Sequence, residues 1–286
     1  MDNVTNDIDE LKKLEKAKPH ILIVGAASTL SGMLCNRLKG RYKITGIDID
    51  NLAEDQSFPG EFHQIGYTKR GVAEIFRSTQ FSTLIHLGRI PASDKSRGKR
   101  YRENVAGTQN LLQLGLNYNV KNFIIISTHL IYGANRTNHL YIREEEPSNA
   151  AKKFIELAGS IELDHEATEF LWQHRSVRTV VLRPTFLVGK HVNHALANAL
   201  RKPFCPKILG YDPLIQILHE SDLIEAILLT IRKKKRGIYN VAGEGVIPFS
   251  KAIKLSGATP LPTPAMVLKG TNVCMSFSAG KFHLIY

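Results

Sequence analysis

The chain has 286 residues, which is enough for one large hydrophobic core or two smaller lobes. Its composition, with 43% hydrophobic and 22% charged residues, is typical of a globular protein. No apolar run reaches the ~18 residues that a membrane-spanning helix requires, and residues 1–19 lack the apolar core of a signal peptide.

The three cysteines, Cys35, Cys205 and Cys274, are odd in number and widely spaced. This pattern predicts neither a disulfide framework nor a metal cluster, so we expect no metal site. Because an apolar leader is also missing, we expect a protein of the reducing cytoplasm that has no membrane partner.

The net charge is +12, and basic residues gather at 95–102 (KSRGKRYR) and 232–236 (RKKKR). One interpretation is attraction to the phosphates of a nucleotide or of a nucleic acid. The other is a solvated surface with lysines favoured at the end of a helix. No aromatic-rich RNA-binding signature accompanies the charge, so a nucleic-acid partner is not favoured.

Apolar, β-rich runs alternate with helical patterns from residue 20 onward. Residues 20–25 predict a buried strand, and the helical pattern after it ends at Gly40. The segments that follow in chain order are a strand at 42–50, a helix at 71–79, a strand at 83–88, a helix at 104–118, a strand at 122–128, a helix at 152–162 and a strand at 178–185. After a looser, proline-containing stretch come a helix at 221–234, a strand at 237–243 and an extended segment at 260–266.

Alternation of this kind, with strands that are apolar throughout, predicts an α/β fold in which a parallel sheet is covered by helices on both faces. We expect a flexible leader at 1–19 and a doubly wound domain at 20–185. Residues 186–270 are expected to mix a smaller C-terminal lobe with a helix and a strand that return to the main sheet. Residues 271–286 form a tail.

The first turn of the predicted sheet, VGAASTLSG at 24–32, has the small residues that a dinucleotide site requires. Glycine permits a tight turn, close approach of a pyrophosphate to backbone N–H groups, and close packing of helix on strand. Asp48 ends the next strand, 23 residues after Gly25, where an acid binds the adenosine ribose. A carboxylate there repels a ribose phosphate, so NAD is favoured over NADP. Asp50 is the alternative acid, and Ser28 has a hydroxyl that can donate to a phosphate.

Eight segments resemble, in order, the extended short-chain dehydrogenases, that is, the NAD-dependent epimerase/dehydratase family. They are VGAASTLSG, GIDID, TLIHLG, ENVAGTQNLL, VKNFIIISTHLIYG, VVLRPTFLVG, ILHESDLIEAI and GIYNVAGEGV, and they cover roughly residues 20–265. The resemblance implies a Rossmann-type sheet that holds NAD(P) and a C-terminal lobe that closes over a substrate, often a nucleotide sugar. It also implies a homodimer.

The resemblance also implies roles for individual residues. Asn104 would support the active site, and Thr128 would bond the substrate oxygen that is oxidised or reduced. Asn104 bridging backbone groups and Thr128 satisfying a local N–H remain the structural alternatives. The residues expected to contact the cofactor are Gly25, Ala27, Ser28, Thr29, Leu30, Asp48, Ile49, Leu87, Gly88, Arg89, Ser127, Pro184, Thr185 and Phe186.

The phosphate turn departs from the family pattern G-x-x-G-x-x-G, because Ser28 and Ser31 replace the second and third glycines and Gly32 comes one place late. The acid that often lies near the adenine falls at Tyr67. The usual H-L-A-A reads HLGR, which places Arg89 near the cofactor. These changes predict weaker NAD binding than is usual for the family.

The larger departure is catalytic, because the family uses a Y-x-x-x-K pair in which the Tyr transfers a proton and the Lys lowers its pKa. Taking Glu162 as the acid four residues after the Lys puts the pair at Phe154 and Ala158. A rival register puts it at 157 and 161. None of the nine tyrosines has a lysine four residues later. Substitute bases near in sequence are His129, Lys152, Lys153 and His165.

Three functions remain open at this point. The first is a nucleotide-binding member of the family with impaired catalysis. The second is an active epimerase, dehydratase or reductase with an unusual base. The third is a basic nucleic-acid-binding protein on the same fold. The sequence after Gly270 no longer resembles the family, so we expect a shortened C-terminal lobe.

Overall fold

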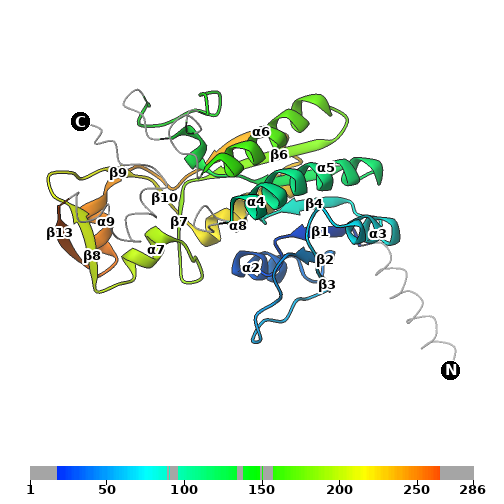
Figure 1. Cartoon of the computed structure of the whole chain (residues 1–286), viewed down its shortest axis with the longest axis horizontal. Coiled ribbons are helices and arrows are strands. Elements are labelled where there is room, and N and C mark those ends of the chain that lie inside the picture. Colours follow the sequence, from blue (N-terminus) through cyan, green and yellow to red (C-terminus); the bar gives the residue numbers. More distant parts are fainter. Residues whose placement is uncertain are drawn as a thin grey trace.

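The central element of the computed structural model, which describes residues 18–88, 90, 96–133, 138–148, 150 and 157–264, is a seven-stranded sheet (Figure 1). Its strands are β1 (His20–Val24), β2 (Lys43–Asp48), β3 (Glu61–Gln64), β4 (Thr83–His86), β5 (Asn122–Ile126), β6 (Arg178–Pro184) and β11 (Gly237–Val241). Their order is β11-β6-β5-β4-β1-β2-β3, and every neighbouring pair is parallel. The predicted parallel sheet is confirmed.

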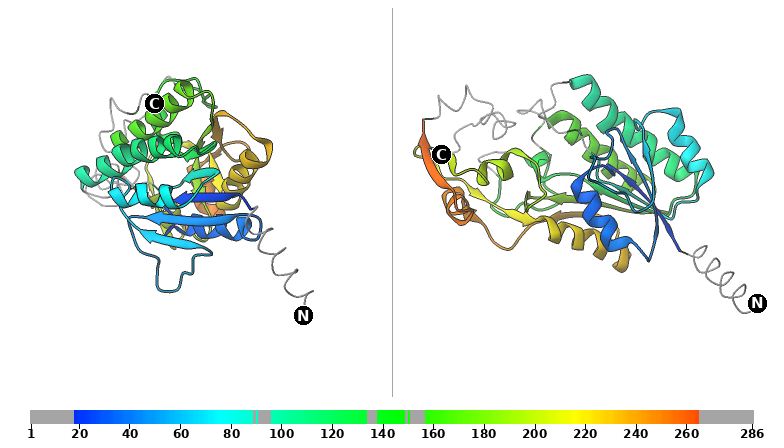
Figure 2. Two further views of the ribbon diagram at one scale, coloured as in Figure 1. Left: turned by 90° about the vertical axis from the view of Figure 1, so that its right-hand side faces the viewer. Right: turned by 90° about the horizontal axis from the view of Figure 1, so that it is seen from below.

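Helices cover both faces of this sheet (Figure 2). On one face lie α3 (Arg70–Ser78), α5 (Gly107–Asn117) and α6 (Ala158–Gln173), and on the other lie α2 (Thr29–Leu38) and α8 (Glu220–Lys233). Side chains of β1 alternate between the two layers: Leu22 and Val24 pack in the first core, and Ile21 and Ile23 pack in the second. Both faces of the strands are therefore dry, which explains why they read as apolar throughout.

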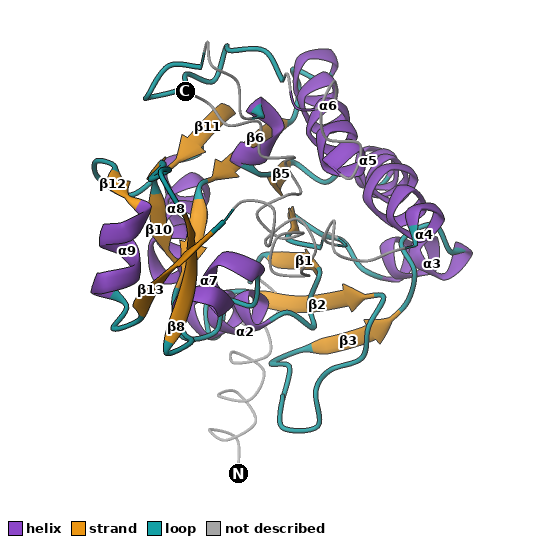
Figure 3. Cartoon of the chain, turned by 60° about the vertical axis from the view of Figure 1, so that its left-hand side comes forward, coloured by secondary structure: helices purple, strands orange, loops and turns teal. Residues whose placement is uncertain are grey.

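A smaller lobe, which contains α7 (Ala195–Leu200), α9 (Phe249–Leu255), β8 (Phe204–Ile208) and β13 (Thr259–Thr263), lies beside the central sheet (Figure 3). Its own core contains Leu196, Cys205, Phe249 and Ile253. The other elements of the lobe are β7 (Phe186–Val188), β9 (Leu214–Ile215), β10 (Ile217–His219) and β12 (Ile247–Pro248). Three two-stranded pairs hold it together, β7 with β10, β8 with β13 and β9 with β12. Within the described part of the chain, no helix is long and apolar enough to cross a membrane.

The helix predicted at 104–118 is longer than expected, because it begins with α4 (Arg97–Tyr101) and a π-helical turn, η1 (Arg102–Ala106). The basic run at 95–102 therefore lies largely in a helix, and Arg100 is buried rather than solvated. A further short helix, the 3-10 helix η2 (His129–Tyr132), follows β5. Of the helix predicted at 152–162, the part from Ala158 onward is the start of α6, and residues 151–156 lie outside the described residues.

The strand order reverses between β1 and β4, since the chain runs outward to β2 and β3 before it returns to β4. In doubly wound sheets, ligands bind at this switch point, in the crevice beyond the carboxyl ends of the strands. The turns after β1, β2, β4, β5 and β6 all lie at this edge because the strands are parallel. The fold thus brings the predicted site segments to one edge of the sheet.

Candidate functional site

The turn after β1 requires glycine at its first position. Gly25 has a φ of +82°, and a Cβ placed on it would lie 2.4 Å from the backbone nitrogen of Gly88. The Gly25 N–H donates to the carbonyl of Ile47 at 2.9 Å, and the N–H of Gly88 donates to the carbonyl of Val24 at 3.0 Å. The turns after β1 and β4 therefore touch, and a side chain at Gly25 would separate them.

The first turn of α2 presents backbone donors to this crevice. Ser28 caps the helix, because its Oγ accepts from the Ser31 N–H, and the same hydroxyl donates to the Gly25 carbonyl at 2.8 Å. Its hydroxyl proton is therefore used within the turn, and the hydrogen bond from Ser28 to a phosphate stays a prediction. Among the described residues, none accepts from the backbone N–H groups of Thr29 and Leu30. Two unpaired donors at a helix N-terminus fit a phosphate.

Asp48 lies at the end of β2 and is 7% exposed. Its Oδ2 accepts from the Ala27 N–H at 2.8 Å and its Oδ1 from the Asp50 N–H at 3.1 Å. Burial raises the pKa of this carboxyl, while the hydrogen bonds oppose the shift. Asp48, rather than the exposed Asp50, is therefore the acid joined to the phosphate turn, while neighbouring Ile49 packs against the core.

Tyr67 occupies the place where the family often has an acid, and it is 2% exposed. A Cβ on Gly88 would lie 2.4 Å from the Tyr67 hydroxyl, so the Tyr67 side chain contacts the turn after β4. The Tyr67 N–H donates to Glu103 Oε2 at 2.9 Å, and Asn110 donates to the Tyr67 carbonyl at 2.6 Å. Burial and nearby carboxylates raise the tyrosine pKa well above its usual value. Tyr67 is therefore a neutral, tightly packed ring at this position.

Asn104 lies in η1 and bridges backbone groups after β4. Its side chain accepts from the Ile90 N–H at 2.8 Å and donates to the Ile90 carbonyl at 2.9 Å. This matches the structural alternative for Asn104, because the side chain fixes the course of the chain beyond Leu87 and Gly88. Arg89 lies outside the described residues. The start of α6 packs against η1, with Gly159 next to the Asn104 side chain.

Two buried hydroxyls at the carboxyl ends of β5 and β6 lack a hydrogen-bond partner among the described residues, Ser127 Oγ and Thr185 Oγ1. Buried polar groups are almost always paired, so an unpaired one calls for an explanation such as a ligand. Thr128 Oγ1 accepts from the Leu130 N–H at 3.3 Å and caps η2. The predicted residues Ser127, Thr128 and Thr185 thus lie on adjacent strands at the same edge.

His129 joins the two strand ends. Its Nδ1 lies 2.9 Å from the Pro184 carbonyl, and its ring meets the Phe186 ring edge-on at a centroid distance of 4.4 Å. The predicted segment 184–186 therefore contacts η2 directly. His165, a second substitute base suggested by the sequence, is exposed on α6, and Lys152, Lys153 and Phe154 lie outside the described residues.

A buried ion pair supports this end of the site. Arg183 on β6 donates to both carboxylate oxygens of Asp164 on α6, at 3.0 and 2.7 Å. Arg183 also donates to the Tyr132 hydroxyl at 2.8 Å and to the Glu144 carbonyl at 3.0 Å. The pair thus fixes α6 and η2 against β6, immediately before Pro184. The sequence signal for it is an arginine in an otherwise apolar strand.

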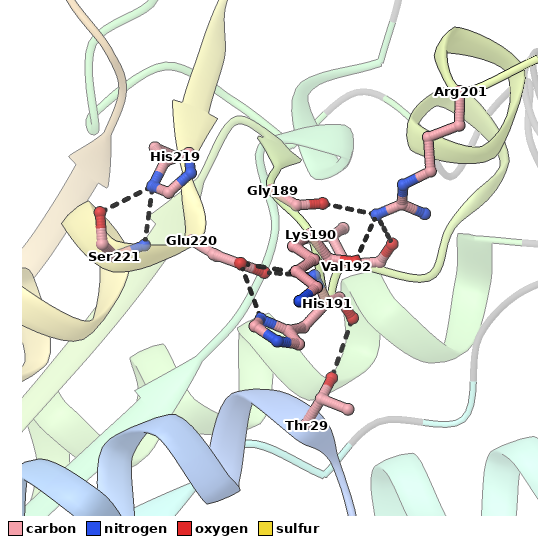
Figure 4. A network of polar contacts seen from close by, with 9 residues as sticks. All are labelled: Thr29, Gly189, Lys190, His191, Val192, Arg201, His219, Glu220 and Ser221. Carbon is pink, nitrogen blue, oxygen red and sulfur yellow. Dashed lines mark hydrogen bonds and ion pairs between the residues drawn. The ribbon is translucent and has the colours of Figure 1, made fainter.

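A short segment that we call the strap (Gly189–Val192) crosses from the small lobe to the phosphate turn (Figure 4). The Thr29 hydroxyl donates to the His191 carbonyl at 2.9 Å. The buried Glu220 carboxylate, at the start of α8, accepts from the His191 N–H and lies 3.0 Å from its Nδ1. Arg201, after α7, donates to three carbonyls of the strap. The role of Glu220 and Thr29 in holding the strap was not predicted.

The geometry fits an extended ligand that contains a diphosphate. Free N–H groups lie at the start of α2, a carboxylate lies at the end of β2, and unpaired hydroxyls lie at the ends of β5 and β6. Along the carboxyl edge, from β2 through β1 to β5 and β6, these groups lie in the order carboxylate, free N–H groups and unpaired hydroxyls, which suits a ribose, a diphosphate and a further polar ring.

Comparison with known proteins gives a consistent result. The profile of the NAD dependent epimerase/dehydratase family matches residues 21–242. An uncharacterized protein of Mycobacterium tuberculosis is 26% identical over 255 residues, 85% of this chain and 67% of that protein. The UDP-glucose 4-epimerase of Dictyostelium discoideum is 23% identical over 312 residues, 93% of this chain and 89% of the relative.

Among solved structures, the UDP-glucose 4-epimerase of Thermus thermophilus, crystallised with NAD, superposes with a TM-score of 0.72 at 19% identity over 86% of each chain. At this identity the likeness establishes the fold. Because the profile covers most of the chain, from β1 through β11, the protein belongs to the NAD dependent epimerase/dehydratase family.

Proposed function

We propose that this protein binds NAD across the carboxyl edge of its sheet, takes a nucleotide sugar beside it, and lacks the proton-transfer pair that the family uses for hydride chemistry. The observation that carries the proposal is the row of unpaired polar groups at that edge, which comprises the first N–H groups of α2 and the hydroxyls of Ser127 and Thr185. The epimerase relatives support the nucleotide-sugar class.

Different residues contact different parts of NAD. The N–H groups of Thr29 and Leu30 hold the diphosphate, and Asp48 accepts from the hydroxyls of the adenosine ribose. Ser127 and Thr185 bond the nicotinamide half. NAD supplies a hydride acceptor when it is bound; the chain's own residues orient it and exclude water. The strap lies against Thr29 and closes the phosphate side of the crevice.

The buried acid of α6 supports a third register for the missing pair. The family places an acid four residues after the catalytic Lys, and Asp164 is the α6 acid that is fully buried against Arg183. Counting back from Asp164 puts the Lys at Ser160 and the Tyr at Glu156. In all three registers neither position carries a Tyr or a Lys. General acid–base catalysis is worth about 10²–10⁴-fold, so redox turnover is reduced by that order.

The runner-up is an active enzyme in which His129 is the base. The observation that favours it is the position of the ring, between the end of β5 and the segment 184–186 that flanks the nicotinamide half. Imidazole is the side chain most often used for proton transfer near neutral pH.

Anaerobic mixing with NAD and either UDP-glucose or UDP-galactose distinguishes the non-catalytic protein from the active enzyme with His129 as base. We expect NAD to raise the melting temperature, Tm, while neither NADH absorbance nor the epimerised sugar appears. Product formation would overturn the non-catalytic proposal, and its loss in His129→Gln with NAD binding intact would assign the base. Failure of NAD to raise Tm would overturn the binding proposal itself.

NAD is expected to bind at least about tenfold more tightly than NADP, because like charges forced together at a binding site cost several kcal/mol. The two charges are the Asp48 carboxylate and the ribose phosphate of NADP. Titrating each dinucleotide against the thermal shift measures the difference. Asp48→Asn should reduce the difference between the NAD and NADP affinities, since it removes the negative charge and keeps the size of the side chain. Equal or tighter NADP binding by the wild type would contradict the role of Asp48.

A further inference from the structure

A pocket of about 270 Å³ lies at the opposite, amino edge of the sheet, far from the crevice. We call it the amino-edge pocket. It opens between the residues that precede β1 and β2, the first residues of β4, β5 and β6, and the end of α8. The lining residues on which the argument depends are Tyr42, Asn122, Arg178, Ile231, Lys234 and Lys235.

Cations from distant parts of the sequence converge on this pocket. Arg178, Lys234 and Lys235 line it. The main chain of Lys43 and of Lys121 adjoins it, because the Lys43 N–H donates to the carbonyl of the lining residue Pro19, and the Arg178 N–H donates to the Lys121 carbonyl.

These five basic residues lack an acidic partner among the described residues. Glu61, an acid at the start of β3, pairs with His63 instead. Like charges gathered without acids repel one another, which destabilises the fold unless a ligand neutralises them.

Lys234 holds an unfavourable backbone conformation at the mouth of the pocket. It ends α8 with a φ of +50° and a ψ of +41°, the left-handed conformation in which glycine is the usual residue. Its N–H donates to the Ile231 carbonyl and the next N–H, of Lys235, donates to the Thr230 carbonyl, so the chain turns back over the pocket. A lysine at this position costs conformational energy that glycine would not, which points to a use for its charge.

The pocket has an apolar wall as well as a charged rim. Tyr42 and Ile231 pack against the core between the sheet and α8, together with Val180, which also lines the pocket. Asn122 and Thr230 add polar side chains nearby. At about 270 Å³, the pocket is slightly smaller than the range of about 300–1,000 Å³ seen for small-molecule sites, which limits its occupant to a small molecule.

We propose that the amino-edge pocket binds a phosphorylated small molecule of mononucleotide size. Its phosphate lies against Arg178, Lys234 and Lys235, and its organic part lies against Tyr42 and Ile231. The site is separate from the crevice at the carboxyl edge by the length of a five-residue strand, roughly 17 Å, so both can be filled at once. The assignment does not depend on the proposed binding of NAD.

The rival explanation is that the lysines only offset the partial negative charge at the end of α8, which favours cations there. The two explanations predict opposite effects of removing charge. If the lysines serve the helix, Lys235→Gln lowers Tm in the absence of ligand. If the pocket is an anion site, its basic residues repel one another when it is empty. Lys235→Gln then raises Tm at low ionic strength, and the increase becomes smaller as salt screens this repulsion.

The test measures Tm and titration calorimetry at low ionic strength with cytidine monophosphate, with inorganic phosphate and with a single-stranded oligouridine. The variants are Lys234→Gly, which relieves the backbone conformation while it removes the charge, and Arg178→Gln. Lys254→Gln, at the exposed end of α9, is the control with the same loss of net charge. Because Lys234→Gly is expected to stabilise the fold, a lost response cannot be attributed to unfolding.

Cytidine monophosphate should raise the Tm of the wild type and of Lys254→Gln. Its affinity should fall at least about tenfold in Lys234→Gly and in Arg178→Gln, because each loses a charge-assisted contact. Inorganic phosphate should bind at the same residues but more weakly, which distinguishes an organic phosphate from the free ion. No response in the wild type, equal affinity in all four proteins, or tight binding of oligouridine alone would each overturn the proposal.

Discussion

Replacing Asp164 by alanine is expected to destabilise the protein by about 3–5 kcal/mol, the usual cost of removing one partner of a buried ion pair. The Asp164 side chain is 0% exposed and that of Arg183 5%, so the guanidinium would remain buried without its carboxylate. For a chain of this size the loss corresponds to a fall in Tm of roughly 6–20 °C. Thermal unfolding followed by circular dichroism measures it.

Glu162→Ala is the matched control, since Glu162 lies on the same helix, is partly exposed and has no ion pair among the described residues. A second control, the double variant Asp164→Leu with Arg183→Met, should recover most of the stability, because apolar replacement of a whole buried pair is often neutral. If Asp164→Ala unfolded no earlier than Glu162→Ala, the pair would not stabilise the junction of α6 and β6.

The inner strands of the central sheet could be predicted because they are buried on both faces, which gives a continuous apolar run in the sequence. The edge strand β3 is different. Its residues Glu61–Gln64 are exposed or only half-buried, so they carry no such run. The start of the helix before α5 was also missed, because its basic residues read as surface while Arg100 is buried against the fold.

The parts of the site that come from one short stretch of the sequence could be predicted. Gly25 and Asp48 belong to one strand–helix–strand unit, and the spacing along the chain fixes their distance in space, as the hydrogen bond from Ala27 to Asp48 illustrates. Contacts between distant segments leave no comparable trace. Thr29 and His191 are 162 residues apart, and the sequence around neither residue indicates that the strap contacts α2.

The start of α6, where we propose that the family's catalytic pair is missing, lies between these cases. Without a Tyr or a Lys to mark it, the sequence has no internal reference for its register, and Glu162 was the more conspicuous acid. Burial against Arg183 distinguishes Asp164 from Glu162, and this difference supports the third register that we propose. No tyrosine in the sequence is followed by a lysine four residues later, so the prediction of a missing Y-x-x-x-K pair does not depend on the choice of register.

Gly25→Ala is expected to remove the NAD-dependent rise in Tm and to destabilise the free protein by about 2–5 kcal/mol. Left-handed backbone costs a residue with a Cβ about 1–2 kcal/mol. Displacing the turn after β4 adds an overpacking cost of about 1–3 kcal/mol, since the new methyl would lie 2.4 Å from the Gly88 nitrogen. The displacement also moves the N–H groups at the start of α2 away from the diphosphate. Thermal shift with and without NAD records both effects.

Gly32→Ala is the control for Gly25→Ala, because it tests whether the effect is specific to the turn after β1 or follows from the loss of any nearby glycine. Gly32 lies inside α2, and a Cβ there would meet nothing within 4 Å. Alanine should therefore stabilise the helix by about 0.5–1 kcal/mol and leave NAD binding unchanged. Such a result would mean that a single glycine, at position 25, is sufficient for the turn, and that the late glycine of this chain is not a displaced member of the family motif. Loss of NAD binding in Gly32→Ala would instead place the diphosphate deeper along α2 than the free N–H groups of Thr29 and Leu30.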